Sequence, residues 1–248
     1  MKRLLLVFSM MLGIASASIA HGSVKNVVLV HGAFADGSGW KEISDILQRD
    51  GYSVYVVQEP ETSLDADVAA ARLVLDRAGP CVLVGHSYGG VIITQAGVHD
   101  AVKSLVYIAA FQPAPGESAA MLEDRLPPAA GKSIVPFGSD YVIIDPAKFP
   151  ADFAADVPVK LAEFQALSQV PFSLASFQGK VTVAAWSQRP SYAVVATNDR
   201  IINPDNERYM TSRAKSETIE LPGSHSLFVH AHSKEIAALI EKAAKAAQ

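Results

Sequence analysis

The sequence has a single cysteine, Cys81, among 248 residues. One cysteine cannot form an intramolecular disulfide, which excludes a small secreted scaffold held together by cross-links. Because Cys81 lies within an apolar run, we expect a buried thiol rather than a nucleophile. Charged residues are also few, at 19%, whereas 50% of the residues are hydrophobic. This composition is typical of a folded domain with a large core and excludes a disordered chain.

The chain also has no excess of positively charged residues. The formal net charge is -4 at pH 7, so nothing predicts nucleic acid or an anionic membrane surface as a partner. Long apolar runs are missing too. The longest one, residues 4–14, is about half of the ~20 residues that a membrane-spanning helix needs.

The N-terminal residues have the pattern of an export signal. Lys2 and Arg3 precede the apolar run, and small residues follow it up to Ala20. This order predicts a secretory signal peptide over residues 1–20 that is cleaved after Ala20. The alternative is an uncleaved membrane anchor. Cleavage predicts a periplasmic or secreted protein of residues 21–248, with no membrane attachment once the signal is removed.

Apolar, β-branched runs alternate with helical patterns along most of the chain. The strand-like runs cover residues 24–30, 52–57, 82–84, 103–109, 192–196 and 217–221. The helical patterns cover residues 39–49, 64–78, 89–98, 205–214 and about 226–247. Continuous apolar strands between helices predict an α/β fold with a mostly parallel six-stranded sheet and helices on both faces.

Regular alternation breaks down over residues 111–190. This segment holds most of the fourteen prolines and only short helical candidates, such as 159–168. We expect a helical cap, inserted into a single domain and lying over the carboxyl ends of the strands. Open α/β sheets bind their ligands at that edge.

Gly85-His86-Ser87-Tyr88-Gly89 joins the third predicted strand to the following helix. It fits G-x-S-x-G, in which a sharp turn exposes the serine hydroxyl, and a side chain two positions away on either side would collide with the turn. We therefore predict that Ser87 is a nucleophile. A glycine-rich turn without chemistry is the alternative. A phosphate-binding loop is disfavoured because the G-x-x-x-x-G-K-[ST] lysine is missing.

A serine nucleophile needs a base, and the base needs an orienting acid. His225 follows the last predicted strand, at the same sheet edge as Ser87, and is the predicted base. His230 and His232 are two positions apart in the final helical pattern, so they do not share a face, and we expect no metal site.

The predicted acid is Asp199, because it follows the strand-like run 192–196 and so lies at the same edge. Asp145 and Asp205 are the alternatives, and both are more typical of a helix or turn cap. The resulting chain order, nucleophile then acid then base, is the order expected on this scaffold.

Backbone N–H groups for the substrate oxyanion are predicted at Ala33, in the turn after the first strand, and at Tyr88, directly after the nucleophile. The alternative for the first turn is that it merely closes the strand. Phe34 and His86 flank these positions and are the predicted substrate contacts. Packing in the core is the alternative for both side chains.

Four motifs together carry a family resemblance: HGAF, GHSYGG, TNDR and PGSH. They resemble the α/β-hydrolase superfamily over nearly the whole chain after the signal. The chain is similar to the small capped esterases that include plant methyl esterases and hydroxynitrile lyases. Gly32 and Ser226 stand where plant hydroxynitrile lyases usually have threonine and lysine, which disfavours cyanohydrin cleavage.

The resemblance and the motifs predict a serine hydrolase with a Ser-His-Asp triad and an acyl-enzyme intermediate. The expected partner is a small or medium hydrophobic carboxylic ester, and no metal or organic cofactor is expected. The alternatives are a lactone, an amide or a carbon–carbon bond as the cleaved group, or a ligand-binding protein with a vestigial triad. The sequence predicts neither the physiological substrate nor the oligomeric state.

Overall fold

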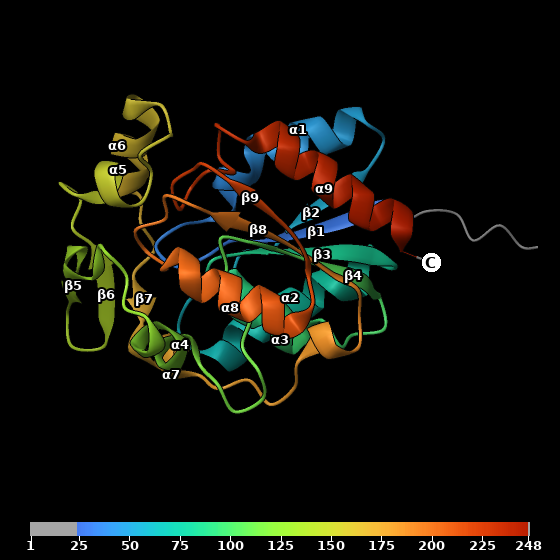
Figure 1. The fold of residues 1–248 in the computed structure, drawn as a ribbon, viewed down its shortest axis with the longest axis horizontal. Coiled ribbons are helices and arrows are strands. Elements are labelled where there is room, and N and C mark those ends of the chain that lie inside the picture. Colours follow the sequence, from blue (N-terminus) through green and yellow to red (C-terminus); the bar gives the residue numbers. More distant parts are fainter. Residues whose placement is uncertain (1–23, 248) are drawn as a thin grey trace, which may run out of the picture.

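The structure of the protein is a computed structural model, and it describes residues 24–247 (Figure 1). The predicted signal peptide, residues 1–20, lies outside the described residues. The main sheet has the strand order β2-β1-β3-β4-β8-β9, and all of its neighbouring strands are parallel. These strands are β1 (Asn26–Val30), β2 (Ser53–Val56), β3 (Cys81–His86), β4 (Val102–Ile108), β8 (Ser191–Ala196) and β9 (Glu217–Leu221). The predicted six-stranded sheet is therefore confirmed.

Helices cover both faces of this sheet. A short 3-10 helix (Gly37–Trp40) leads into α1 (Lys41–Arg49), which packs with α9 (Ser233–Ala246) on one face. On the other face lie α2 (Leu64–Ala78), α3 (Gly89–Ala96) and α8 (Pro204–Ala214) (Figure 1). With both faces covered, the central strands are almost wholly buried, which is why they are continuous apolar runs. None of the helices within residues 24–247 combines the length and apolar content needed to cross a bilayer.

The insertion between β4 and β8 contains both helices and strands, and it lies beyond one end of the main sheet (Figure 1). Its helices are α4 (Ala119–Arg125), α5 (Phe149–Asp152), α6 (Val159–Leu167) and α7 (Leu174–Gln178), with 3-10 turns at Gly131–Ser133 and Ala185–Ser187. A second, antiparallel sheet joins β5 (Ile134–Phe137), β6 (Tyr141–Ile144) and β7 (Phe172–Ser173). The sequence did not predict this sheet, because its strands are too short to show alternation and β5 contains Pro136. Proline is tolerated there because β5 is an edge strand.

The last helix begins later than its apolar pattern predicted. The prediction placed its start at about Ser226, whereas α9 begins at Ser233. Hydrogen bonds to the insertion explain the difference: Ser226 N donates to the Phe153 carbonyl at 3.0 Å, and Ser224 N donates to Asp156 Oδ2 at 2.6 Å. These contacts keep residues 222–232, including His225, outside the helix, with turns over residues 225–232.

Candidate active site

Ser87 lies at the sharp turn between β3 and α3. Its φ angle of +55° is in the left-handed region, which costs an L-residue about 1–2 kcal/mol. A Cβ atom on Gly85 would lie 2.6 Å from the Gly89 carbonyl oxygen, and one on Gly89 would overlap the His31 carbonyl oxygen. The turn therefore requires glycine at both positions, as the motif predicted.

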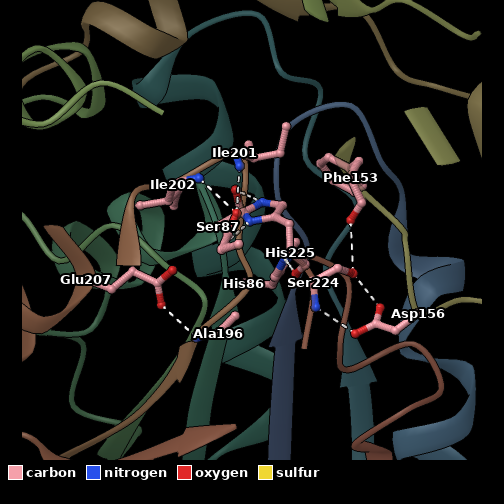
Figure 2. A network of polar contacts seen from close by, with 11 residues as sticks. His86, Ser87, Phe153, Asp156, Ala196, Ile201, Ile202, Glu207, Ser224 and His225 are labelled. Atoms are coloured by element: carbon pink, nitrogen blue, oxygen red, sulfur yellow. Dashed lines mark hydrogen bonds and ion pairs between the residues drawn. The ribbon is translucent and has the colours of Figure 1, made fainter. Parts of the chain in front are cut away.

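Ser87, His225 and Asp199 follow the carboxyl ends of β3, β9 and β8, and Figure 2 shows Ser87 beside His225. Ser87 Oγ lies 2.8 Å from His225 Nε2, and His225 Nδ1 lies 2.6 Å from Asp199 Oδ2. One tautomer satisfies both contacts: Nδ1–H donates to the carboxylate, and Nε2 accepts the serine proton. The structure thus brings the three predicted side chains into one hydrogen-bonded chain, although 138 positions separate the serine from the histidine.

The Asp199 carboxylate is held on both sides. Its Oδ1 accepts hydrogen bonds from Ile201 N at 2.7 Å and Ile202 N at 2.9 Å (Figure 2). Its Oδ2 faces the imidazole. Two backbone donors on one oxygen fix the plane of the carboxylate, so the other oxygen is oriented before any substrate binds.

Glu207, on α8, is buried next to Asp199, and its Oε2 accepts a hydrogen bond from Ala196 N at 3.2 Å (Figure 2). Burial, followed by the negative charge of Asp199, raises the pKa of Glu207 well above its usual value. Both causes disfavour a second negative charge beside the Asp199 carboxylate. No sequence pattern singled out Glu207, because a glutamate on a helix is ordinarily exposed.

His86 was predicted to contact the substrate, and the structure places its side chain behind His225. His86 packs against His225 with ring centroids 4.6 Å apart, and its Nε2–H donates to the His225 carbonyl at 2.9 Å. Burial, with the neighbouring His225 adding to it, lowers the pKa of His86 well below its usual value. His86 supports the His225 loop and lines a smaller neighbouring pocket rather than the cavity above Ser87, so its contact with a substrate stays a prediction.

The insertion also holds the His225 loop. Asp156 accepts hydrogen bonds from both the backbone N–H and the hydroxyl of Ser224 (Figure 2). The Phe153 ring packs edge-on against the His225 imidazole at 4.8 Å. The side chain of His225 is fully buried. Sequence reasoning missed Asp156, because no local pattern links it to a loop 68 positions away.

The other histidines and aspartates considered as candidates lie elsewhere. His230 and His232 pair with glutamates near the protein surface. Asp205 pairs with Arg208 at 2.7 Å, and Asp145 accepts a hydrogen bond from the backbone two residues further on. Within residues 24–247, no three histidine, cysteine, aspartate or glutamate side chains are grouped so that they could hold a metal ion.

A cavity of about 200 Å³ lies above Ser87. Main-domain and insertion residues both line it, and most of them are apolar. The apolar members are Ala33, Phe34, Phe111, Ala119, Ile134, Val142, Phe172, Leu174, Phe177 and Ile201. Phe34, a predicted substrate contact, is thus in the wall. The one carboxylic acid among the lining residues is Glu123, which the sequence did not single out.

Ala33 and Tyr88 lie beside Ser87 in the cavity wall. In the part of the chain that the structure describes, no backbone acceptor is bonded to the N–H of either residue. Unpaired N–H groups in a protein interior are rare. The turn that carries Ala33 is braced by the next residue, Phe34, whose φ is +65° and whose N–H donates to Glu61 Oε2 at 3.4 Å. Both predicted oxyanion donors are therefore available to a bound substrate.

A cluster of buried polar side chains lies behind this turn. Asp67 accepts hydrogen bonds from the Tyr88 hydroxyl and from Glu61 N, both at 2.8 Å. His31 Nδ1 lies 3.1 Å from Glu59 Oε1. Burial lowers the pKa of His31 to about 4, raises that of Glu61 to about 9, and raises that of Glu59 well above its usual value. His31 and Glu61 are therefore neutral near pH 7.

Comparison with known proteins gives consistent matches. A family model described as "Alpha/beta hydrolase family" matches residues 27–239. The chain is 31% identical over 128 residues to a carbendazim hydrolyzing esterase of Nocardioides sp. (strain SG-4G). That match covers 44% of this chain and 52% of the esterase, so the chain spans about half the length of this relative.

Solved structures resemble nearly the whole chain. A pyrethroid hydrolase from Sphingobium faniae JZ-2 has a TM-score of 0.78 at 22% identity, covering 90% of this chain and 98% of that one. Polyneuridine aldehyde esterase has a TM-score of 0.74 at 16% identity, covering 88% and 98%. At these identities the likeness establishes the fold, and it confirms the predicted similarity in fold to the methyl esterase branch.

Proposed function

The chain belongs to the alpha/beta hydrolase family, and on that basis we propose that it is a serine esterase cleaving a small or medium, mostly hydrophobic carboxylic ester. The observation that carries this proposal is the hydrogen-bonded chain from Ser87 through His225 to Asp199 at the wall of an apolar cavity. The names of the similar proteins, an esterase that hydrolyses carbendazim and a pyrethroid hydrolase, support ester hydrolysis as the reaction class.

Acylation begins when Ser87 Oγ attacks the ester carbonyl carbon while His225 Nε2 takes the hydroxyl proton. Asp199 holds the imidazole in the required tautomer and stabilises its positive charge. The carbonyl oxygen becomes an oxyanion that accepts hydrogen bonds from the backbone N–H groups of Ala33 and Tyr88, each lowering the barrier by about 3 kcal/mol. The carbon–oxygen bond to the alcohol then breaks, and the alcohol leaves with the proton from His225.

Deacylation repeats these steps with water as the nucleophile. His225 takes a proton from water as the water oxygen attacks the acyl-enzyme carbonyl. The second oxyanion uses the same two N–H donors. The bond to Ser87 Oγ then breaks, Oγ regains its proton from His225, and the carboxylic acid is released. Every step uses only groups of this chain, the substrate and water.

Turnover of p-nitrophenyl acetate and butyrate tests the proposal. We expect the protein to release p-nitrophenol, to be labelled by a fluorophosphonate probe at Ser87, and to lose both properties in Ser87→Ala. A folded protein that shows neither turnover nor labelling would be a ligand-binding protein instead. A panel of methyl, aryl, lactone and amide substrates then identifies the bond that is cleaved.

A further inference from the structure

Glu123 is the one carboxylic acid among the residues that line the cavity above Ser87, most of which are apolar. Glu123 lies on α4, one helical turn after Ala119, and both residues line the cavity. The nearby walls are aromatic or aliphatic, with Phe111, Ile134 and Phe177 among them. The position of Glu123 on the inner face of α4 is therefore fixed by the helix.

No protein partner satisfies the Glu123 carboxyl group. Among residues 24–247, no side chain or backbone group forms a hydrogen bond or ion pair with it. The nearest basic residue along the helix, Arg125, is engaged elsewhere: it stacks over the Tyr209 ring at 3.6 Å and contacts Asn206. Burial, with the charge of Asp124 adding to it, raises the pKa of Glu123 to about 7.

The Glu123 carboxyl group is half-buried and has no protein partner, so it is free to pair with a ligand in the cavity. A carboxylate there accepts hydrogen bonds and attracts positive charge, and the low local dielectric strengthens both interactions. It repels a second carboxylate for the same reason. The apolar walls can take the hydrocarbon part of the same ligand.

We propose that Glu123 forms an acidic subsite that selects substrates with a protonated amine on the hydrocarbon group that fills the cavity. This inference rests on the proposed function, and it narrows the substrate from a generally hydrophobic ester to a hydrophobic ester that carries a cationic head. Esters with a second, anionic carboxylate are disfavoured. Glu123 acts in binding and takes no part in the bond-breaking steps.

The test compares three linear probes with the same hydrocarbon chain: hexylamine, hexan-1-ol and hexanoate. Each is used as a competitive inhibitor of p-nitrophenyl acetate hydrolysis at about pH 8, where Glu123 is mostly ionised and hexylamine is protonated. We expect hexylamine to inhibit at least about tenfold more strongly than hexanoate, with hexan-1-ol between them. In Glu123→Gln the ratio of the inhibition constants should fall to near one.

The matched control is Asp124→Asn, which removes the same charge from the adjacent position, on the exposed side of α4. We expect this variant to keep the wild-type preference for hexylamine within about twofold, because a screened surface charge contributes little. Thermal unfolding of each variant shows that the fold is kept. An unchanged probe ratio in folded Glu123→Gln, or a wild-type preference for hexanoate, overturns the subsite.

Calorimetry on Ser87→Ala separates this inference from the proposed function, because binding there needs no turnover. Tighter binding of hexylamine than of hexanoate to Ser87→Ala supports the subsite even if the wild-type protein hydrolyses no ester. Ester turnover by the wild type without any preference among the three probes overturns the subsite and leaves the esterase proposal standing.

Discussion

At the scale of single residues, the two carboxylate oxygens of Asp199, the proposed acid, have different hydrogen-bond partners. Asp199 Oδ1 accepts hydrogen bonds from two backbone N–H groups, while Oδ2 accepts one from the imidazole Nδ1–H of His225. Glu207 adds a buried carboxyl group on the far side, with a pKa raised first by burial and then by Asp199. The negative charge is thereby kept where it orients His225.

Asp199→Asn tests this arrangement. Its amide keeps the size of the side chain but removes the negative charge that selects the His225 tautomer, so we expect kcat for p-nitrophenyl acetate to fall by about 10³ to 10⁴ with little effect on folding. The control is Asp205→Asn, which changes an exposed aspartate paired with Arg208 and should leave kcat within about twofold. Near-normal turnover by Asp199→Asn would exclude Asp199 as the acid.

At the scale of elements, the start of α3 is packed against the chain that leaves β4. A Cβ atom on Gly90 would overlap the Phe111 carbonyl oxygen and lie 2.9 Å from the Ala110 Cβ atom. Backbone cannot move aside as a flexible side chain can. This close contact positions the first turn of α3, and Ser87 directly before it, at the sheet edge beside the cavity.

Gly90→Ala should therefore destabilise the protein. We expect a loss of about 1–3 kcal/mol, seen as a melting temperature lower by roughly 3–10 °C in thermal unfolding followed by circular dichroism. Gly39→Ala is the matched control, because its Cβ atom would make only ordinary contacts of 3.5 Å or more. Equal melting temperatures for the two variants would show that the α3 contact is loose in solution.

At the scale of the whole molecule, the buried cluster behind the oxyanion turn makes stability depend on pH. Glu61 has a pKa of about 9 in the folded protein, against an ordinary value of 4.5. The free energy of unfolding that Glu61 contributes is fully present below about pH 4.5 and is lost as pH rises toward 9. The loss occurs because Glu61 releases its proton at a lower pH in the unfolded chain than in the folded protein. The pKa of His31 is lowered from 6.5 to about 4, so the stability that His31 contributes rises with pH between pH 4 and pH 6.5.

Glu61→Gln should flatten the alkaline side of the stability curve. In the wild type we expect the free energy of unfolding to fall between pH 7 and pH 9, with a slope of up to about 1.4 kcal/mol per pH unit from Glu61. Urea unfolding at pH 5, 7 and 9 measures this slope. The control is Glu163→Gln, on an exposed residue paired with Lys160, which should keep the wild-type slope. Parallel curves for wild type and Glu61→Gln would contradict this assignment.

Export is a second prediction at this scale. We expect the chain expressed in a bacterium to be recovered outside the cytoplasm with His21 as its first residue, because the signal pattern ends at Ala20. Intact mass spectrometry and N-terminal sequencing identify the cleavage site. Ala20→Arg, which places a large charged residue at the cleavage position, should leave the signal attached. A wild-type chain that keeps Met1 and stays with the membranes would be anchored instead.

The sequence alone determined the sheet, the elbow and the three residues proposed for catalysis. Strand and helix periods are local properties. The G-x-S-x-G pattern around Ser87 is also local, because a Cβ atom on Gly85 would collide with Gly89 four positions away. Parallel strands end at a common edge, so Asp199 and His225 could be placed near Ser87 from chain order. Only the tertiary structure decided the support role of His86, the late start of α9, the small second sheet and the places of Glu123 and Glu207. Each of these depends on contacts between the insertion or a helix and distant parts of the main domain, and local patterns carry no information about such contacts.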